Sequence, residues 1–91
     1  MNPWWGYIEE ARKAGGKFTR RMKDLAWRPE TCAVGEATGG RHDLFTDQVH
    51  ENRMFSGRFT RAVETDEVDL AEETLIKIED EVLRMKREGL L

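Results

Sequence analysis

The chain has 91 residues, 36% of them charged and 38% hydrophobic, so we expect one domain that buries only roughly two-thirds of its unfolded surface. No stretch approaches the roughly 18 apolar residues of a membrane span, and the N-terminus does not read as a signal peptide. A single cysteine, Cys32, excludes an internal disulfide. These features predict a soluble cytoplasmic protein, or one of the host cytoplasm if its origin is viral.

The formal charge of −3 is unevenly distributed along the chain. Residues 1–41 hold eight Lys and Arg but five Asp and Glu, whereas residues 42–91 hold seven and thirteen. The two halves therefore attract each other, and the same complementarity could join one copy to the next. A basic segment of this kind can also contact nucleic acid.

The first predicted helix runs from Pro3 to Ala14, with Asn2 as its cap and Gly15-Gly16 at its end. Trp4 and Trp5 are adjacent, so their side chains point about 100° apart and one helix face cannot bury both. One of the two must meet something else. It either lies against a neighbouring segment of the chain or anchors a partner.

The second predicted helix begins after Thr19, a plausible N-cap, runs from Arg20 to Trp27, and is stopped by Pro29. The most basic patch of the chain lies here, with Phe18 and Trp27 interleaved: Lys17, Arg20, Arg21, Lys23 and Arg28. Such a patch suits a weak contact with a phosphate backbone, and it equally suits a solvated helix face. The acidic total charge makes nucleic acid the second choice of partner.

A short helix is predicted within residues 29–36, with Cys32, Ala33 and Val34 turned inward, and residues 37–41 form a glycine-bearing loop. A lone cysteine among apolar neighbours is typical of a small core residue. The alternative is a nucleophile paired with a histidine.

Three segments, Phe18-Thr19, Leu25-Ala26-Trp27 and residues 31–36, form a pattern together with residues further along the chain. The later members are Phe59, Ala62-Val63, Ala71 and Ile78-Glu79. This pattern resembles that of short uncharacterised helical proteins of prokaryotes and their phages. The resemblance implies a helical fold and a phage or mobile-element origin, and it assigns no functional residue.

Two long helices are predicted at Asp43–Glu64 and Asp66–Glu88. The apolar face of the first consists of Leu44, Phe45, Val49, Met54, Phe55, Phe59, Ala62 and Val63. Gly57 inside it predicts a bend or a close backbone approach. Thr65 and Asp66 make the turn, and either can cap the last helix. The fold class is therefore all-α, a small helical bundle built on a C-terminal antiparallel hairpin, with short helices and a glycine-rich loop in residues 1–41.

The last helix carries an apolar seam at helical spacing: Ala71, Leu75, Ile78, Val82 and Met85. Leu70, Ile76 and Leu83 widen it, so the seam must be covered by the chain or by a second copy. We therefore expect a non-enzymatic protein–protein interaction module that forms a homo-oligomer and also binds another protein. The expected interface residues are Trp4, Trp5, Leu75, Ile78, Val82 and Met85.

Catalytic and metal-binding patterns are weak. Cys32, His42 and His50 do not have the spacing of a zinc site, and Asp47-x-x-His50 lacks the matching carboxylates of a metal-binding bundle. Residues 35–40 lack the lysine of a phosphate-binding loop. We therefore expect no enzyme activity, no metal and no cofactor.

Overall fold

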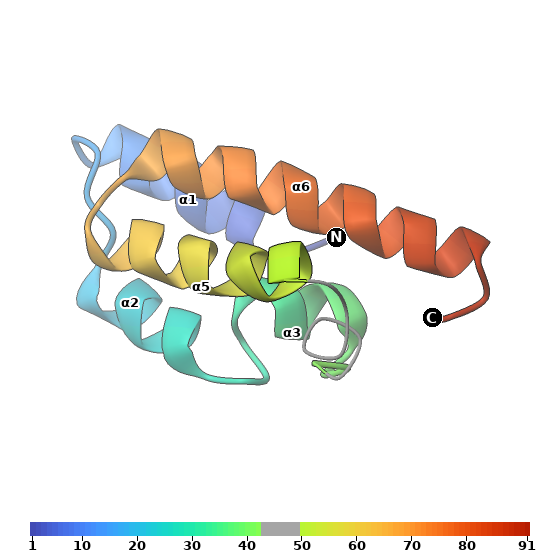
Figure 1. Ribbon diagram of the computed structural model, residues 1–91. Helices are drawn as coiled ribbons and strands as arrows, with labels where there is room; N and C mark the ends of the chain where they lie inside the picture. The colour runs from blue at the N-terminus through green and yellow to red at the C-terminus, as the bar shows by residue number, and fades with distance from the viewer. Residues whose placement is uncertain (43–49) are drawn as a thin grey trace.

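The computed structural model describes residues 1–42 and 50–91, and for residues 50–56 it describes the backbone alone. The described helices are α1 (Trp4–Lys13), α2 (Arg20–Trp27), α3 (Ala33–Thr38), α5 (His50–Glu64) and α6 (Val68–Arg87) (Figure 1). The described part of the chain contains no strand, which confirms the predicted all-α class. Part of the helix predicted at Asp43–Glu64, residues 43–49, lies outside the described residues. The structure also does not describe five side chains that were expected on its apolar face: Leu44, Phe45, Val49, Met54 and Phe55.

α5 and α6 form the predicted antiparallel hairpin, joined by a short turn at residues 65–67 (Figure 1). α1 and α3 pack against α6, while α2 packs against α5. The C-terminal turns of α6 extend beyond α1 and α5 in this view. The chain is thus a small bundle in which α6, the longest of the described helices, is covered along one side.

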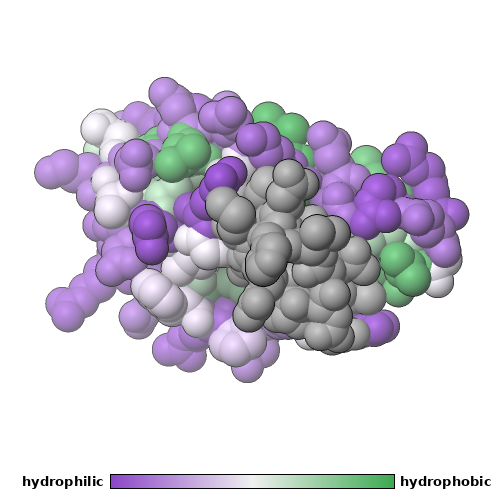
Figure 2. Space-filling model, viewed as in Figure 1, coloured by the Kyte–Doolittle hydropathy of each residue, from purple (hydrophilic) through white to green (hydrophobic). Residues whose placement is uncertain are grey.

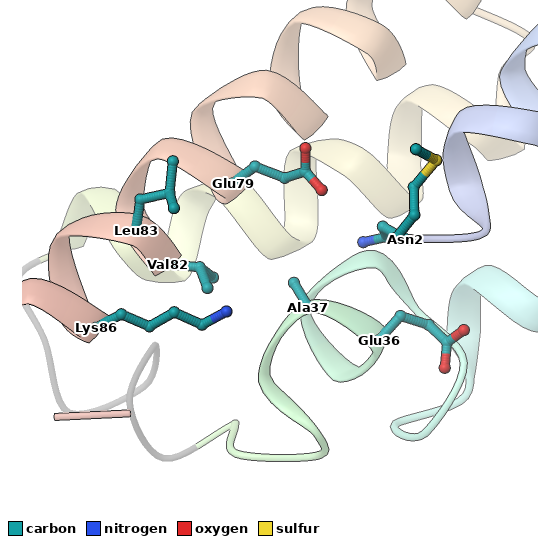
Figure 3. A pocket seen from close by; sticks show the side chains of 8 residues that line it. Asn2, Glu36, Ala37, Glu79, Val82, Leu83 and Lys86 are labelled. Atoms are coloured by element: carbon teal, nitrogen blue, oxygen red, sulfur yellow. The ribbon is translucent and has the colours of Figure 1, made fainter.

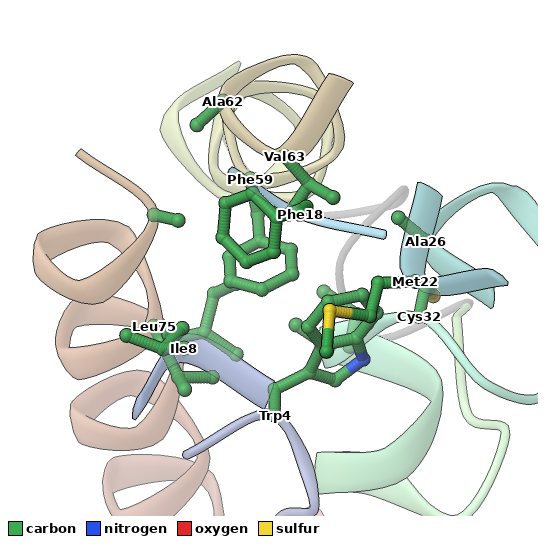
Figure 4. Packing of buried hydrophobic residues seen from close by; sticks show 14 of the residues in the cluster. Trp4, Ile8, Phe18, Met22, Ala26, Cys32, Phe59, Ala62, Val63 and Leu75 are labelled. Carbon is green, nitrogen blue, oxygen red and sulfur yellow. The ribbon is translucent and has the colours of Figure 1, made fainter. Parts of the chain in front are cut away.

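The core is one cluster of apolar side chains that all the described helices supply (Figure 4). Trp4 is at its centre with no exposed surface, and its rings meet those of Tyr7 and Phe59 edge to face at centroid distances of 5.0 Å. The indole N–H of Trp4 donates to the Thr31 carbonyl at 2.7 Å, so the buried polar atom is satisfied.

The predicted seam of α6 is buried in this core. Ala71, Leu75, Ile78 and Met85 have no exposed surface and Val82 is 5% exposed. The prediction that Leu70, Ile76 and Leu83 widen the seam is wrong for the single chain, because they are 38%, 46% and 56% exposed. The neighbouring helices cover one side of α6, and these three residues lie outside that contact.

Side chains accept backbone N–H groups at the starts of α1, α2 and α3. The Asn2 carboxamide oxygen accepts the Trp4 N–H at 3.0 Å while its amino group donates to the Ala33 carbonyl, so the predicted cap also ties α1 to α3. The Thr19 hydroxyl accepts the Met22 N–H, as its N-cap position predicts. These bonds satisfy donors that the first turn of a helix leaves unpaired.

The turn before α6 differs from the prediction. Glu67 precedes the helix without a side-chain cap, and Asp66 adopts a left-handed conformation with φ of 60°. Its carboxylate instead accepts the Phe18 N–H at 2.9 Å and binds Lys23. The bond from Phe18 is the main cause that lowers the pKa of Asp66. A tertiary contact thus takes the place of the local cap, and it joins the hairpin turn to the start of α2.

Two glycines differ in what surrounds them. A methyl group at Gly35 would lie 2.0 Å from the Pro29 carbonyl oxygen, so α3 can approach residue 29 only because this position is glycine. At Gly57 the helix α5 is continuous, so the predicted break is absent, and a methyl group there would meet nothing within 4 Å, so the predicted close approach is absent too. The close approach is in α3 rather than in α5.

Candidate interaction surfaces

The residues predicted to form an interface with a partner make their contacts within the chain instead. Trp4, Leu75, Ile78, Val82 and Met85 are buried in its own core. Trp5 is half-buried, and its indole N–H donates to Glu79 at 2.9 Å. Both tryptophans therefore have partners within the bundle. A protein partner would meet the exposed neighbours of these residues instead.

The outer side of α6 offers such neighbours. Ile76 and Leu83 are seven residues apart, and Leu90 follows at the same interval just beyond the helix with 43% of its surface exposed. We call these three residues the outer stripe. Figure 2 shows hydrophilic side chains over most of one face of the molecule, with small separate hydrophobic areas along α6 and near the C-terminus. Seven residues are almost two full turns of an α-helix, so Ile76 and Leu83 lie on the same side of α6 and a second helix could cover both.

A groove of about 360 Å³ lies beside the stripe, between α3 and the C-terminal half of α6 (Figure 3). Its walls are formed by Met1, Asn2, Glu36, Ala37, Glu79, Val82, Leu83 and Lys86. In Figure 3 the Lys86 side chain extends toward Ala37. Leu83 thus belongs to both the groove and the stripe, and it is the most exposed apolar side chain of α6.

Charged groups flank the outer stripe in a definite order. Asp80 and Glu79 lie between Ile76 and Leu83, whereas Lys86 and Arg87 follow Leu83. Asp80 and Arg87 are exposed and carry no ion pair in the described part of the chain. Arg84, in contrast, is paired with Glu81 and Glu88. Of the four charged groups named first, the acidic two precede Leu83 and the basic two follow it, whereas Lys77 and Glu88 have the opposite order.

The predicted basic segment is divided by the fold. Lys23 is 3.2 Å from Asp66 and so is neutralised within the chain. Lys17, Arg20, Arg21 and Arg28 are exposed. The three arginines have no carboxylate partner among the described side chains, while Lys17 contributes to lowering the pKa of Asp66. Four of the five predicted residues therefore remain accessible to a ligand.

Cys32 and His42 are brought together, although their sequence spacing suggested no site. The Cys32 sulfur lies 3.8 Å from His42 Nε2, which is itself 2.5 Å from the Pro29 carbonyl oxygen. Because a carbonyl oxygen only accepts, this nitrogen must donate to it and is not free to take the thiol proton. Burial raises the pKa of Cys32, and its sulfur accepts the Gly35 N–H at the start of α3. The arrangement favours a capping role for the thiol over a nucleophilic one.

The remaining candidates are not tested by this geometry. Asp47 lies outside the described residues, and of His50 only the backbone is described. In residues 1–42 and 57–91, no three His, Cys, Asp or Glu side chains form a group that could hold a metal ion. Among the helices described, none has both the length and the apolar composition of a membrane span.

Comparisons with protein-family models, with curated proteins and with solved structures find no match to this chain. The resemblance to short helical proteins of prokaryotes and phages therefore stays a prediction. Any functional conclusion must come from the surfaces described above.

Proposed function

We propose that this protein is a small, non-enzymatic protein–protein interaction module that associates with a second copy of itself through the outer stripe of α6. The observation that carries the proposal is the exposure of Leu83, 56%, at the middle of three apolar side chains spaced by seven residues. The inner seam of the same helix is already filled, so the stripe is the part of α6 that remains for helix packing.

The order of the charges favours an antiparallel pair. In a symmetric antiparallel arrangement centred on Leu83, Leu83 meets Leu83, and Ile76 of one copy lies toward the C-terminal end of α6 of the other, beyond which Leu90 follows. The same register puts Asp80 beside Arg87 of the second copy and Glu79 beside Lys86. A parallel arrangement would instead place each of these charges beside its own kind, which is unfavourable.

The area available predicts a weak association. Each apolar side chain of the stripe contributes roughly 1.5–3 kcal/mol if it becomes fully buried. Association costs about 4–15 kcal/mol in lost translational and rotational freedom. Because these side chains are only about half exposed in the single chain, two copies of the stripe gain about half of the sum for full burial. This gain is of the same order as the cost, so dimer formation should depend strongly on protein concentration.

A charge-reversal cycle tests the arrangement. Asp80→Arg and Arg87→Asp each bring like charges together at both symmetry-related positions, and each should weaken dimerisation roughly 3- to 30-fold at low salt. The double variant restores opposite charges and should recover the affinity. Sedimentation velocity over a range of concentrations measures all four proteins, and thermal melting checks that each folds.

If the double variant did not regain the dimer affinity of the wild type, the antiparallel pairing would be contradicted. Lys77→Glu is a matched control, because Lys77 is an exposed cation of α6 that lies outside the proposed charge pairs. Its reversal should leave the dimer affinity within twofold of the wild type at the same salt.

A further inference from the structure

Trp27 is the most exposed aromatic side chain whose surface the structure describes. It lies at the end of α2 with 66% of its surface accessible, whereas Trp4 is buried and Trp5 is half-buried. A hollow of about 670 Å³ adjoins it and is also lined by Thr60, Arg61 and Glu64 of α5. An indole beside an open hollow has a face to which a flat ligand can stack.

Exposed arginines lie on both of these helices, and Arg61 lines the same hollow as Trp27. The Thr60 hydroxyl donates to the Ala26 carbonyl at 3.1 Å and so fixes the end of α2 against α5. The exposed sides of the two helices therefore form one surface. We call it the α2–α5 face, and its exposed arginines are Arg20, Arg21, Arg28, Arg58 and Arg61.

The charges of the α2–α5 face are not balanced within the chain. Among the described side chains, its exposed carboxylates are Asp24, Glu30 and Glu64, fewer than its arginines. Arg12, in contrast, is neutralised within the chain, because it binds Asp69 and Glu72. The net positive charge of this one face, on an acidic protein, indicates a ligand that carries negative charge.

We propose that the α2–α5 face binds single-stranded nucleic acid, with a base stacked on Trp27 and neighbouring phosphates held by Arg28 and Arg61. Stacking on an exposed indole needs a base that is not enclosed between two others in a duplex. The combination of aromatic and guanidinium groups therefore fits an unpaired strand better than a duplex. It fits a bare polyanion less well, because a polyanion without bases would not use Trp27.

The test measures binding of fluorescently labelled oligothymidylate and oligouridylate by anisotropy, next to a blunt DNA duplex of equal length. We expect the single strands to bind more tightly than the duplex, and their affinity to fall about 10- to 100-fold when salt rises from about 50 to about 200 mM, as several phosphate contacts require. A preference between the two strands distinguishes DNA from RNA as the ligand.

Variants assign the binding to the face. Trp27→Leu should weaken single-strand binding roughly 5- to 150-fold, the effect of losing one stacked base, and Trp27→Phe should retain most of it. Arg61→Glu should weaken binding to all nucleic acids. Lys77→Glu changes the net charge equally but lies on α6, and it should have little effect. Melting curves show whether each variant is folded.

Three results would overturn the proposal. One is no binding of either single strand at low salt, and another is a duplex that binds as tightly as the single strands. The third is equal affinity of the wild type and Trp27→Leu, which would remove the stacked base even if arginine-dependent binding remained. This test is separate from the test of self-association. The variants that should weaken the dimer, Asp80→Arg and Arg87→Asp, lie on α6 and not on the α2–α5 face.

Discussion

The two sides of α6 carry similar side chains in opposite environments. On the inner side Leu75 and Ile78 have no exposed surface, whereas on the outer side Ile76 and Leu83 are about half exposed. All four are aliphatic residues that lie between positions 75 and 83 of one helix. The comparison shows that residue type alone does not decide between core and surface. The position of the neighbouring helices does.

The same contrast appears among the charges. Arg12 and Lys23 are bound by carboxylates from the hairpin, but the arginines of the α2–α5 face have no such partners among the described side chains. The attraction between the basic and the acidic half of the chain, which the sequence predicts, is thus present at Arg12 and at Lys23 but not at the α2–α5 face. The charged groups without a partner among the described side chains lie on the surfaces where a ligand or partner can bind.

The largest expected effect is on the inner side of α6. Ile78→Asp puts a carboxylate among apolar groups and removes the buried side chain, so it should cost about 4 kcal/mol or more of the free energy of unfolding. Ile76→Asp makes the same chemical change two residues away, at a position that is 46% exposed. It should change the stability of the monomer by less than about 1 kcal/mol.

Urea unfolding followed by circular dichroism compares the two variants. Equal loss of stability in both would mean that the outer side of α6 is also part of a core. A fully stable Ile78→Asp variant would mean that the inner seam is not buried.

A smaller loss is expected where α3 approaches residue 29. Gly35→Ala forces the Pro29 carbonyl to move, and overpacking of this kind costs about 1–3 kcal/mol. Gly57→Ala is the control, because the site is open and alanine favours helix, so it should gain up to about 1 kcal/mol. Thermal melting of both variants measures the difference. The same sign for both changes would contradict the close contact at Gly35.

The smallest effect concerns the pH dependence of the contact between the hairpin turn and α2. The pKa of Asp66 is lowered in the folded chain, so its contribution to stability is present above the ordinary aspartate pKa, about 3.9, and is lost as the pH falls through the lower folded value. Asp66→Asn keeps an oxygen for the Phe18 N–H, and asparagine tolerates the left-handed turn. The wild type should therefore be more stable than the variant near neutral pH, and this advantage should shrink in acid.

Urea midpoints of the two proteins at neutral and acidic pH measure this advantage. A constant difference at every pH would show that the charge of Asp66 does not contribute. A difference that grows in acid would reverse the sign expected from a lowered pKa.

The sequence predicted the elements of the fold whose causes are local. The cap at Thr19, the end of α2 before Pro29 and the helical spacing of Ala71, Leu75 and Ile78 each depend on residues within a few positions. These features therefore appear in the structure as expected. The hairpin follows for the same reason, since a short turn between two helices leaves little choice but an antiparallel pair.

The sequence could not predict contacts that join distant segments. Asp66 was expected to cap α6, but it binds Phe18 and Lys23. The sequence predicts that Leu70, Ile76 and Leu83 widen the seam, because a helical spacing shows which side chains share a face but not how much of that face the neighbouring helices cover. Trp27 and Arg61 were not linked at all, since 33 residues separate them and only the packing of α2 on α5 brings them to one hollow.

The most direct measurement is the solution mass of the wild type and of Leu83→Glu, by light scattering coupled to size exclusion at high salt and over a range of concentrations. Leu70→Glu is the matched control, an exposed leucine of α6 outside the stripe. We predict that the wild type and Leu70→Glu approach the mass of a dimer as concentration rises, while Leu83→Glu stays monomeric with an unchanged melting temperature. A wild type that is monomeric at every concentration, or a Leu83→Glu variant that still dimerises, would contradict self-association through the outer stripe.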